Sequence, residues 1–224
     1  KNLTNDLENQ TSEIGLPTEN FSILDQMSVV ILAAGKSHRM GKAKGLLDYK
    51  GEPFILTQIG KIKEIGIDDI IIVLGKDHQT YLNHVPELNK YEIVVNTKPE
   101  RGQFSSLQCG LEKAVSINKK AVFVLPIDVP CPEREVWYNL GFSLLKDKKE
   151  VVVPEYQGKK GHPVLLNINF IEYLLSLDET SSRLDEEIKK LEGKKKVGII
   201  SVQDRKITLN LNTIEAWKKY LVSA

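Results

Sequence analysis

The sequence has few cysteines, few aromatic residues and no long apolar run. Its 224 residues include two cysteines, Cys109 and Cys131, and no Cys-x-x-Cys spacing. This argues against a disulfide framework or a zinc site and favours a reducing cytoplasm. The longest apolar runs, such as 29–34, are far below the roughly 18 residues that a membrane span needs, and the polar N-terminal segment lacks the apolar core of a signal peptide. We therefore expect a cytoplasmic protein that does not span a membrane.

The sequence also lacks a net charge large enough to attract extended polyanions. Its 31 basic and 30 acidic side chains leave a formal charge of +1, so neither nucleic acid nor a membrane surface is an expected partner. The charge is unevenly distributed, because residues 1–27 carry one basic and five acidic side chains. The rest of the chain is therefore basic.

Short runs rich in valine and isoleucine alternate with helical patterns from residue 28 onward, which is typical of stacked βα units. Strands are expected at 28–32, 69–74, 91–96, 121–125, 150–154, 163–167 and 196–202, and helices at 53–65, 105–116, 133–146, 169–176, 181–191 and 213–221. Several strands are continuously apolar, which predicts burial on both faces of a mostly parallel sheet. Hairpin signals at 46–52 and 153–164 predict an antiparallel strand as well. The pattern predicts a three-layer α/β domain over 28–224, preceded by a polar, acidic tail over 1–27.

A basic loop with two glycines directly follows the first predicted strand. It carries four cations between Lys36 and Lys44, and no acidic side chain occurs between Asp25 and Asp48. Small residues let backbone N–H groups approach an anion closely, so the loop suits a triphosphate. It is not a Walker A loop, because Val30 stands where the first glycine is needed, and it does not match the dinucleotide fingerprint.

This loop resembles the LAAGxSxRMGxxK signature of the MobA-like nucleotidyltransferases, which act on molybdenum cofactors. The resemblance implies a Rossmann-like nucleotidyltransferase fold. It implies that Leu32, Ala33, Ala34 and Gly35 meet the nucleotide base. It also places Arg39 and Lys44 on the triphosphate as catalytic residues. His78 and His84, in a polar stretch further along, are interpreted as surface residues.

Three further motifs extend the resemblance. The stretch 102–111 is similar to Gly-x-x-x-Ser-Leu-x-x-Gly-Leu of the molybdopterin cytidylyltransferase branch, which implies that Gly102 and Ser106 lie against the base. Asp128 ends a predicted strand between two prolines and is implied to be the principal, catalytic ligand of Mg²⁺, with Mn²⁺ as the alternative metal. Asn212 is implied to be a second ligand, although the family has aspartate there, so metal affinity would depend more on the bound triphosphate. The Gly-His-Pro motif of that branch is matched by Gly161, His162 and Pro163, which implies contact with the pterin substrate.

Together the motifs predict transfer of CMP from CTP to the phosphate of molybdopterin, with or without molybdenum, and release of pyrophosphate. CTP is favoured because the methyl group of Ala34 leaves less room for a purine than the glycine of the guanylyltransferase branch. A molybdenum hydroxylase is the implied recipient of the product. Three alternatives stay open: a GTP-using guanylyltransferase, a transferase for a sugar or alditol phosphate, and a nucleotide-binding regulator without catalysis.

Overall fold

The computed structural model describes residues 23–35 and 41–223. Within them the main sheet follows the order β10-β7-β9-β6-β1-β4-β5, with β8 paired to β7. The strands are β1 (Met27–Ala33), β2 (Asp48–Tyr49), β3 (Glu52–Pro53), β4 (Ile70–Leu74), β5 (Glu92–Val95), β6 (Ala121–Pro126), β7 (Val151–Tyr156), β8 (Lys159–Lys160), β9 (Val164–Asn167) and β10 (Val197–Ser201). Strand β9 lies antiparallel between β6 and β7, whereas the strands on either side of it run parallel to one another. The predicted mostly parallel sheet with an antiparallel strand is confirmed.

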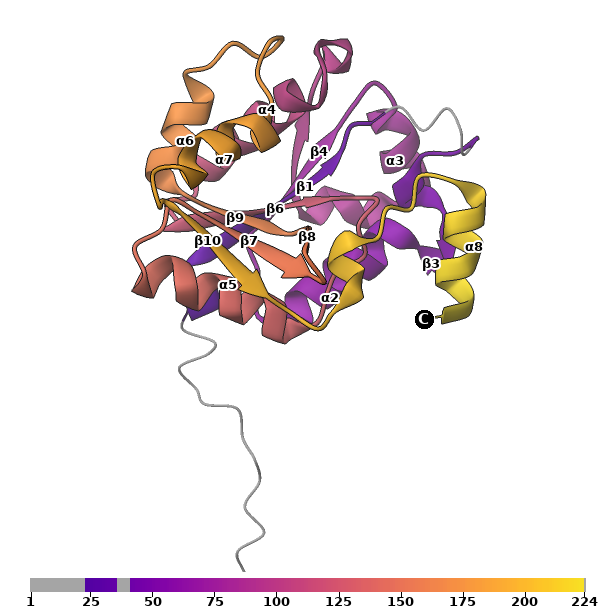
Figure 1. Cartoon of the computed structure of the whole chain (residues 1–224). Coiled ribbons are helices and arrows are strands. Elements are labelled where there is room, and N and C mark those ends of the chain that lie inside the picture. Colours follow the sequence, from indigo (N-terminus) through magenta and orange to yellow (C-terminus); the bar gives the residue numbers. More distant parts are fainter. Residues whose placement is uncertain (1–22, 36–40, 224) are drawn as a thin grey trace, which may run out of the picture.

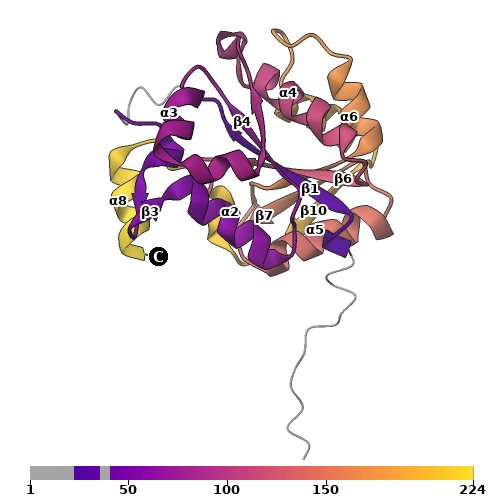
Figure 2. The ribbon, with the colours of Figure 1, turned by 180° about the vertical axis from the view of Figure 1, so that it is seen from behind.

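Helices cover both faces of this sheet. They are α2 (Phe54–Ile65), α3 (His78–His84), α4 (Gln103–Ser116), α5 (Arg134–Lys146), α6 (Ile168–Leu175), α7 (Leu184–Glu192) and α8 (Ile214–Ser223), with short 3₁₀ turns η1 (Lys44–Leu46), η2 (Pro86–Lys90), η3 (Pro99–Arg101) and η4 (Arg205–Thr208). Helices α4, α6 and α7 lie on one face, and α2 and α5 on the other (Figures 1 and 2). None of the helices described is long and apolar enough to cross a membrane.

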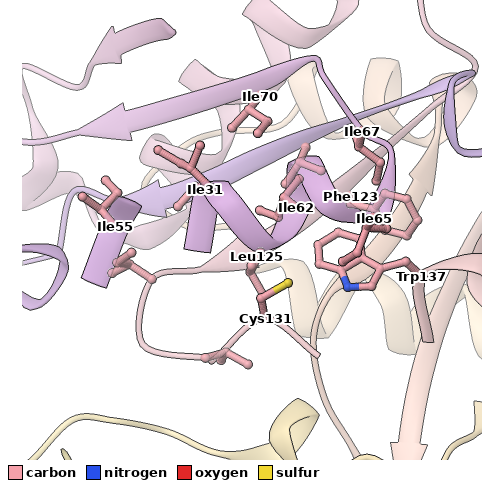
Figure 3. Close-up of a cluster of buried hydrophobic side chains, with 14 of the residues drawn as sticks. Ile31, Ile55, Ile62, Ile65, Ile67, Ile70, Phe123, Leu125, Cys131 and Trp137 are labelled. Atoms are coloured by element: carbon pink, nitrogen blue, oxygen red, sulfur yellow. The ribbon is translucent and has the colours of Figure 1, made fainter. Parts of the chain in front are cut away.

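Alternate residues of the central strand supply the two hydrophobic cores. In β1, Val29 and Ile31 pack into the core beneath α2 and α5, while Val30 and Leu32 pack into the core beneath α4. The α2–α5 core contains Trp137, whose ring meets Phe123 edge-on at 4.8 Å between centroids (Figure 3). Burial on both faces explains why the strands are continuously apolar.

Two parts of the chain differ from expectation. Helix α3 forms in the polar stretch 78–84, where no helix is predicted. Its Tyr81 is buried, while His84 is exposed as expected. The core also begins earlier than residue 28, because Leu24 and Met27 are buried at 0% and 1% exposure. Residues 1–22 of the expected tail lie outside the described residues.

The order of the strands creates a topological switch point, at which a ligand can bind, at one edge of the sheet. Strand β1 pairs with β4 on one side and β6 on the other, so the chain leaves β1 in one direction and later returns to its opposite side. Ligands bind open α/β sheets at this kind of switch point, beyond the carboxyl ends of the strands. Here these ends lead into the loops that carry Gly35 and Asp128.

Candidate active site

Three segments far apart in the sequence meet beyond β1 and β6. The ammonium of Lys44 lies 3.0 Å from the Asp128 Oδ2 atom and also donates to the Asn212 Oδ1 atom. The Lys44 and Asp128 side chains are 20% and 19% exposed. The structure thus brings together two of the three predicted catalytic residues and both predicted metal ligands.

An aromatic cluster fixes the C-terminal segment that carries Asn212. Trp217 and Tyr220 of α8 pack against the β2–β3 hairpin and the start of α2, with Trp217 edge-on to Phe54 at 4.9 Å and Tyr220 stacked on Tyr49 at 5.7 Å between ring centroids. Such pairs contribute about 0.5–1.5 kcal/mol beyond area burial. The cluster holds the chain before α8 beside the loop of Lys44.

Backbone hydrogen bonds position Asp128. The N–H of Ile127 donates to the Leu32 carbonyl at 3.0 Å, which continues the β1–β6 pairing, and the N–H of Leu211 donates to the Asp128 carbonyl at 2.8 Å. The buried amide of Gln58 supports the next turn, because its Nε2 atom donates to the Val129 carbonyl at 2.7 Å. Hydrogen bonds to β1, to the segment before α8 and to α2 therefore fix the backbone around Asp128.

A small cavity of about 340 Å³ lies directly at this cluster. Its lining includes all six residues expected to bind the nucleotide, together with two of the expected catalytic residues: Leu32, Ala33, Ala34, Gly35, Gly102, Ser106, Lys44 and Asp128. The third expected catalytic residue, Arg39, lies outside the described residues. The structure thus places eight of the motif residues around one cavity, and their roles stay predictions.

The start of α4 forms one wall of the small cavity, and this wall depends on Gly102 and on a buried asparagine. Gly102 has φ +104°, a conformation that L side chains rarely adopt. The Nδ2 atom of Asn96 donates to Ser105 Oγ and Ser106 Oγ, each at 2.9 Å, and its Oδ1 atom accepts from the Lys98 N–H at 2.9 Å. Ser105 in turn donates to the Gly102 carbonyl at 2.8 Å. Ser106 is therefore part of a network that positions the wall.

A larger cavity of about 590 Å³ adjoins the small one, and the two share Leu32, Gly102, Gln103 and Pro126 in their linings. Its floor is apolar and comes mainly from α4, α7 and the sheet. The charged residues that line it are Arg101, Lys160, Arg183, Lys189, Asp185 and Glu192. Three of the four basic side chains are ion-paired, Arg101 with Glu179, Lys160 with Glu192 and Arg183 with Asp185. A ligand with an apolar body and an anionic group would fit this lining if its anion took the place of these carboxylates.

Ion pairs attach the segment around α7 to both walls of the large cavity. Arg101 pairs with Glu179 in the turn before α7, and Lys160 of β8 pairs with Glu192 at its end. The carboxyl of nearby Asp178 accepts four hydrogen bonds from Thr180 and Ser181, which lower its pKa to about 2. The acidic turn is thus a structured element of the cavity wall.

The Gly-His-Pro motif combines a structural glycine with a buried histidine. A Cβ on Gly161 would lie 2.6 Å from the carbonyl carbon of Ile207 and closer still to its oxygen, so only glycine allows this close approach. His162 lines the large cavity, and its buried Nδ1 atom finds no hydrogen-bond partner among the described residues. Burial lowers the pKa of His162, offset in part by the Val124 backbone and the charge of Asp128. Burial thus favours the neutral imidazole at the edge of the cavity, whereas Pro163 is buried and does not line the cavity.

Sequence reasoning missed one residue that lines the small cavity, Tyr81, and one that supports its wall through hydrogen bonds, Asn96. Tyr81 lines it and accepts a hydrogen bond from the Gly45 N–H at 3.2 Å, next to Lys44. Burial raises the pKa of Tyr81, so its hydroxyl keeps its proton. Asn96 was expected only as a strand end. In both cases the sequence signal was a single polar residue in an unremarkable segment.

Comparison with known proteins identifies relatives of this fold. The model of the MobA-like NTP transferase domain matches residues 29–194. A molybdenum cofactor guanylyltransferase of Ectopseudomonas mendocina is 26% identical over 49% of this chain and 51% of its own length. The purine catabolism protein PucB of Bacillus subtilis is 31% identical over 45% of this chain and 52% of its own. The chain thus spans about half the length of these curated relatives.

Solved structures agree on the fold. The crystal structure of Rv0371c from Mycobacterium tuberculosis H37Rv has a TM-score of 0.74 at 22% identity, covering 89% of this chain and 98% of that chain. A nucleotidyl transferase from Methanothermobacter, Mth528, has a TM-score of 0.72 at 15% identity, covering 88% and 96%. The Rossmann-like nucleotidyltransferase fold expected from the sequence is confirmed.

Proposed function

Because the chain belongs to the MobA-like NTP transferase family, we propose that it is a nucleotidyltransferase that moves CMP from CTP to the phosphate of molybdopterin and releases pyrophosphate. The observation that carries this proposal is the gathering of eight motif residues around the small cavity, beside a larger cavity with a basic rim. One cavity would take the nucleotide and the other the pterin phosphate.

In the proposed reaction a phosphate oxygen of the acceptor attacks the α-phosphorus of CTP in line. The new bond joins this oxygen to the α-phosphorus, and the bond to the bridging oxygen of pyrophosphate breaks. The protein has to align two anions and neutralise their charge. Lys44, and Arg39 by resemblance, would stabilise the charge that moves onto the leaving group, and each charge-assisted hydrogen bond contributes about 1.5–3 kcal/mol. Loss of Lys44 should lower the rate by roughly 10- to 200-fold.

The residues at Lys44 fit a magnesium ion. The Asp128 and Asn212 oxygens converge on one cationic group, which shows that they can face a single cation. No cluster of three His, Cys, Asp or Glu side chains occurs among the described residues, and Mg²⁺ commonly takes only one or two protein oxygens besides water and substrate phosphate. We propose that Asp128 and Asn212 hold it and that the bound metal supplies charge neutralisation at the phosphates.

The neutral His162 would hydrogen-bond the pterin substrate from the β8–β9 loop, which lines the large cavity. Its Nδ1 atom is buried without a partner among the described residues, and a ligand would relieve the cost of about 1–3 kcal/mol that such an atom incurs. Gly161 contributes to this arrangement by its packing on Ile207. A molybdenum hydroxylase would receive the product.

A GTP-dependent reaction is the second candidate, because a guanylyltransferase is among the relatives that match. The choice of CTP rests on Ala34, which is 7% exposed and lines the small cavity. Removing its methyl group by Ala34→Gly should raise kcat/KM for GTP relative to CTP. Ala121→Gly is the matched control. It removes a buried methyl group at the start of β6, at the end of the strand that is remote from Asp128, and should leave this ratio unchanged.

Pyrophosphate release with molybdopterin and each of CTP, GTP, UTP and ATP tests the proposal. We expect turnover with CTP, loss of turnover in Asp128→Asn, and no loss in the exposed Asp48→Asn. Faster pyrophosphate release with GTP than with CTP would favour the second candidate, the GTP-dependent reaction. Release only with a sugar or alditol phosphate would contradict the pterin acceptor, and nucleotide binding without release on any acceptor would contradict catalysis.

A further inference from the structure

Lys44 occupies the point at which the two proposed metal ligands converge. Its ammonium contacts Asp128 and Asn212 at the same time, although Asn212 lies 168 residues further along the chain. The Lys44 and Asp128 side chains are about four-fifths buried. Solvent ions therefore screen this cluster much less than a surface ion pair.

The backbones of the three segments are held independently of this contact. The Gly45 N–H donates to the Tyr81 hydroxyl, and the Leu211 N–H donates to the Asp128 carbonyl. The backbone segments that carry the carboxylate and the amide therefore stay next to each other when the ammonium leaves. The lysine side chain, with its flexible four-carbon stem, is the part that can move away.

The charges of the cluster explain why it would bind metal poorly by itself. Asp128 contributes one negative charge, Lys44 cancels it, and Asn212 is neutral. A divalent cation that arrives alone meets a site with no net charge and an ammonium in its place, and like charges at such distances repel strongly where screening is weak. A nucleoside triphosphate changes this balance, because its phosphate oxygens offer the ammonium another partner.

We propose that Lys44 acts as a stand-in cation that blocks the metal site until a nucleoside triphosphate draws the ammonium away. Metal and nucleotide then bind with positive coupling, and by linkage each raises the affinity for the other by the same factor. The inference rests on the proposed function in two respects, the assignment of Asp128 and Asn212 as metal ligands and the binding of a nucleoside triphosphate next to Lys44. It gives Lys44 a role before the reaction in addition to its role at the phosphates.

Binding of Mn²⁺ to the nucleotide-free full chain, measured from the EPR signal of free Mn²⁺, tests the proposal. Lys44→Met should bind Mn²⁺ at least about tenfold more tightly than the wild type, within the range usual for coupled sites. Lys42→Met removes the same charge from an exposed position of the same loop and should stay within about twofold. Adding Asp128→Asn to Lys44→Met should abolish the gain.

The coupling itself supplies a second measurement. CTP should tighten Mn²⁺ binding strongly in the wild type and much less in Lys44→Met. Circular dichroism verifies folding of each variant, and Lys44→Gln, which retains a polar side chain, replaces the methionine variant if that variant is unfolded. Equal Mn²⁺ affinity in the wild type and Lys44→Met would overturn the proposal, as would an equal gain in Lys42→Met.

These outcomes are separable from those of the proposed function. Tight Mn²⁺ binding in Lys44→Met together with absence of wild-type turnover on molybdopterin would support the stand-in role and refute the acceptor. Turnover with CTP and molybdopterin together with unchanged Mn²⁺ affinity in Lys44→Met would support the reaction and refute the stand-in role.

Discussion

Replacing Asn96 by alanine should destabilise the fold and weaken nucleotide binding together. The variant loses three hydrogen bonds of 2.9 Å, to Ser105 Oγ, Ser106 Oγ and the Lys98 N–H. At about 0.5–1.5 kcal/mol each, the loss amounts to about 3 kcal/mol. In a protein of this size about 1 kcal/mol corresponds to 2–4 °C, so Tm should fall by roughly 6–12 °C.

The same substitution should affect substrate binding more than chemistry. Asn96 is only 4% exposed and does not line the small cavity, but it fixes the segment that carries Gly102 and Ser106. KM for the nucleotide should therefore rise by a larger factor than the one by which kcat falls. Urea unfolding and steady-state pyrophosphate release measure the two effects.

Asn89→Ala is the matched control for Asn96→Ala. Asn89 is exposed and its amide donates one hydrogen bond, to the Pro86 carbonyl at 3.1 Å, so its loss should change the free energy of unfolding by about 0.5 kcal/mol or less. Equal unfolding free energies for Asn96→Ala and Asn89→Ala would refute the network argument. A fall in kcat with unchanged KM would refute the positioning role.

Three further predictions concern the walls of the two cavities. Gly161→Ala should destabilise the fold by about 1–3 kcal/mol because its Cβ would overlap Ile207, whereas Gly193→Ala, with open space around it, should be nearly neutral in urea unfolding; equal effects would contradict the packing argument. Tyr81→Phe keeps the ring but leaves the Gly45 N–H without its partner, so it should cost about 0.5–1.5 kcal/mol and raise KM for the nucleotide, and unchanged values of both would dismiss its role. Burial lowers the pKa of His162 below its ordinary 6.5, so the unfolded chain binds this proton first and stability falls as the pH drops below about 6.5; His162→Gln should flatten this part of the curve in urea titrations between pH 7 and 5, and an unaltered slope would show that His162 is not the cause.

The sheet and the small cavity could be predicted because the responsible signals are local. Seven predicted strands correspond to β1, β4, β5, β6, β7, β9 and β10 within a few residues, since each is an apolar run bounded by turn residues. The loop after β1 and the Asp128 turn could then be placed at one edge, because parallel strands end on the same side. Helix α3 escaped detection because Tyr81 is its only fully buried residue, which gives no apolar periodicity.

Contacts between distant polar residues could not be predicted in this way. The pairing of Arg101 with Glu179 and of Lys160 with Glu192 depends on where α7 crosses the large cavity, and no local pattern specifies that. Likewise, the motif indicated Gly161 as a substrate contact, while the structure shows a packing reason for the glycine. A motif identifies a position in the fold, and the surrounding atoms decide which physical demand the residue meets.

Asn212 shows how sequence and structure together explain the expected metal binding. The sequence indicated that Asn212 in place of aspartate would make metal binding depend on the triphosphate, because a charge is missing. The structure adds that Lys44 cancels the charge that remains, on Asp128. With aspartate at 212 the cluster would keep a net negative charge beside the lysine, and a divalent cation could be attracted without nucleotide. The asparagine and the lysine therefore act in the same direction, and both favour loading of the metal together with its nucleotide.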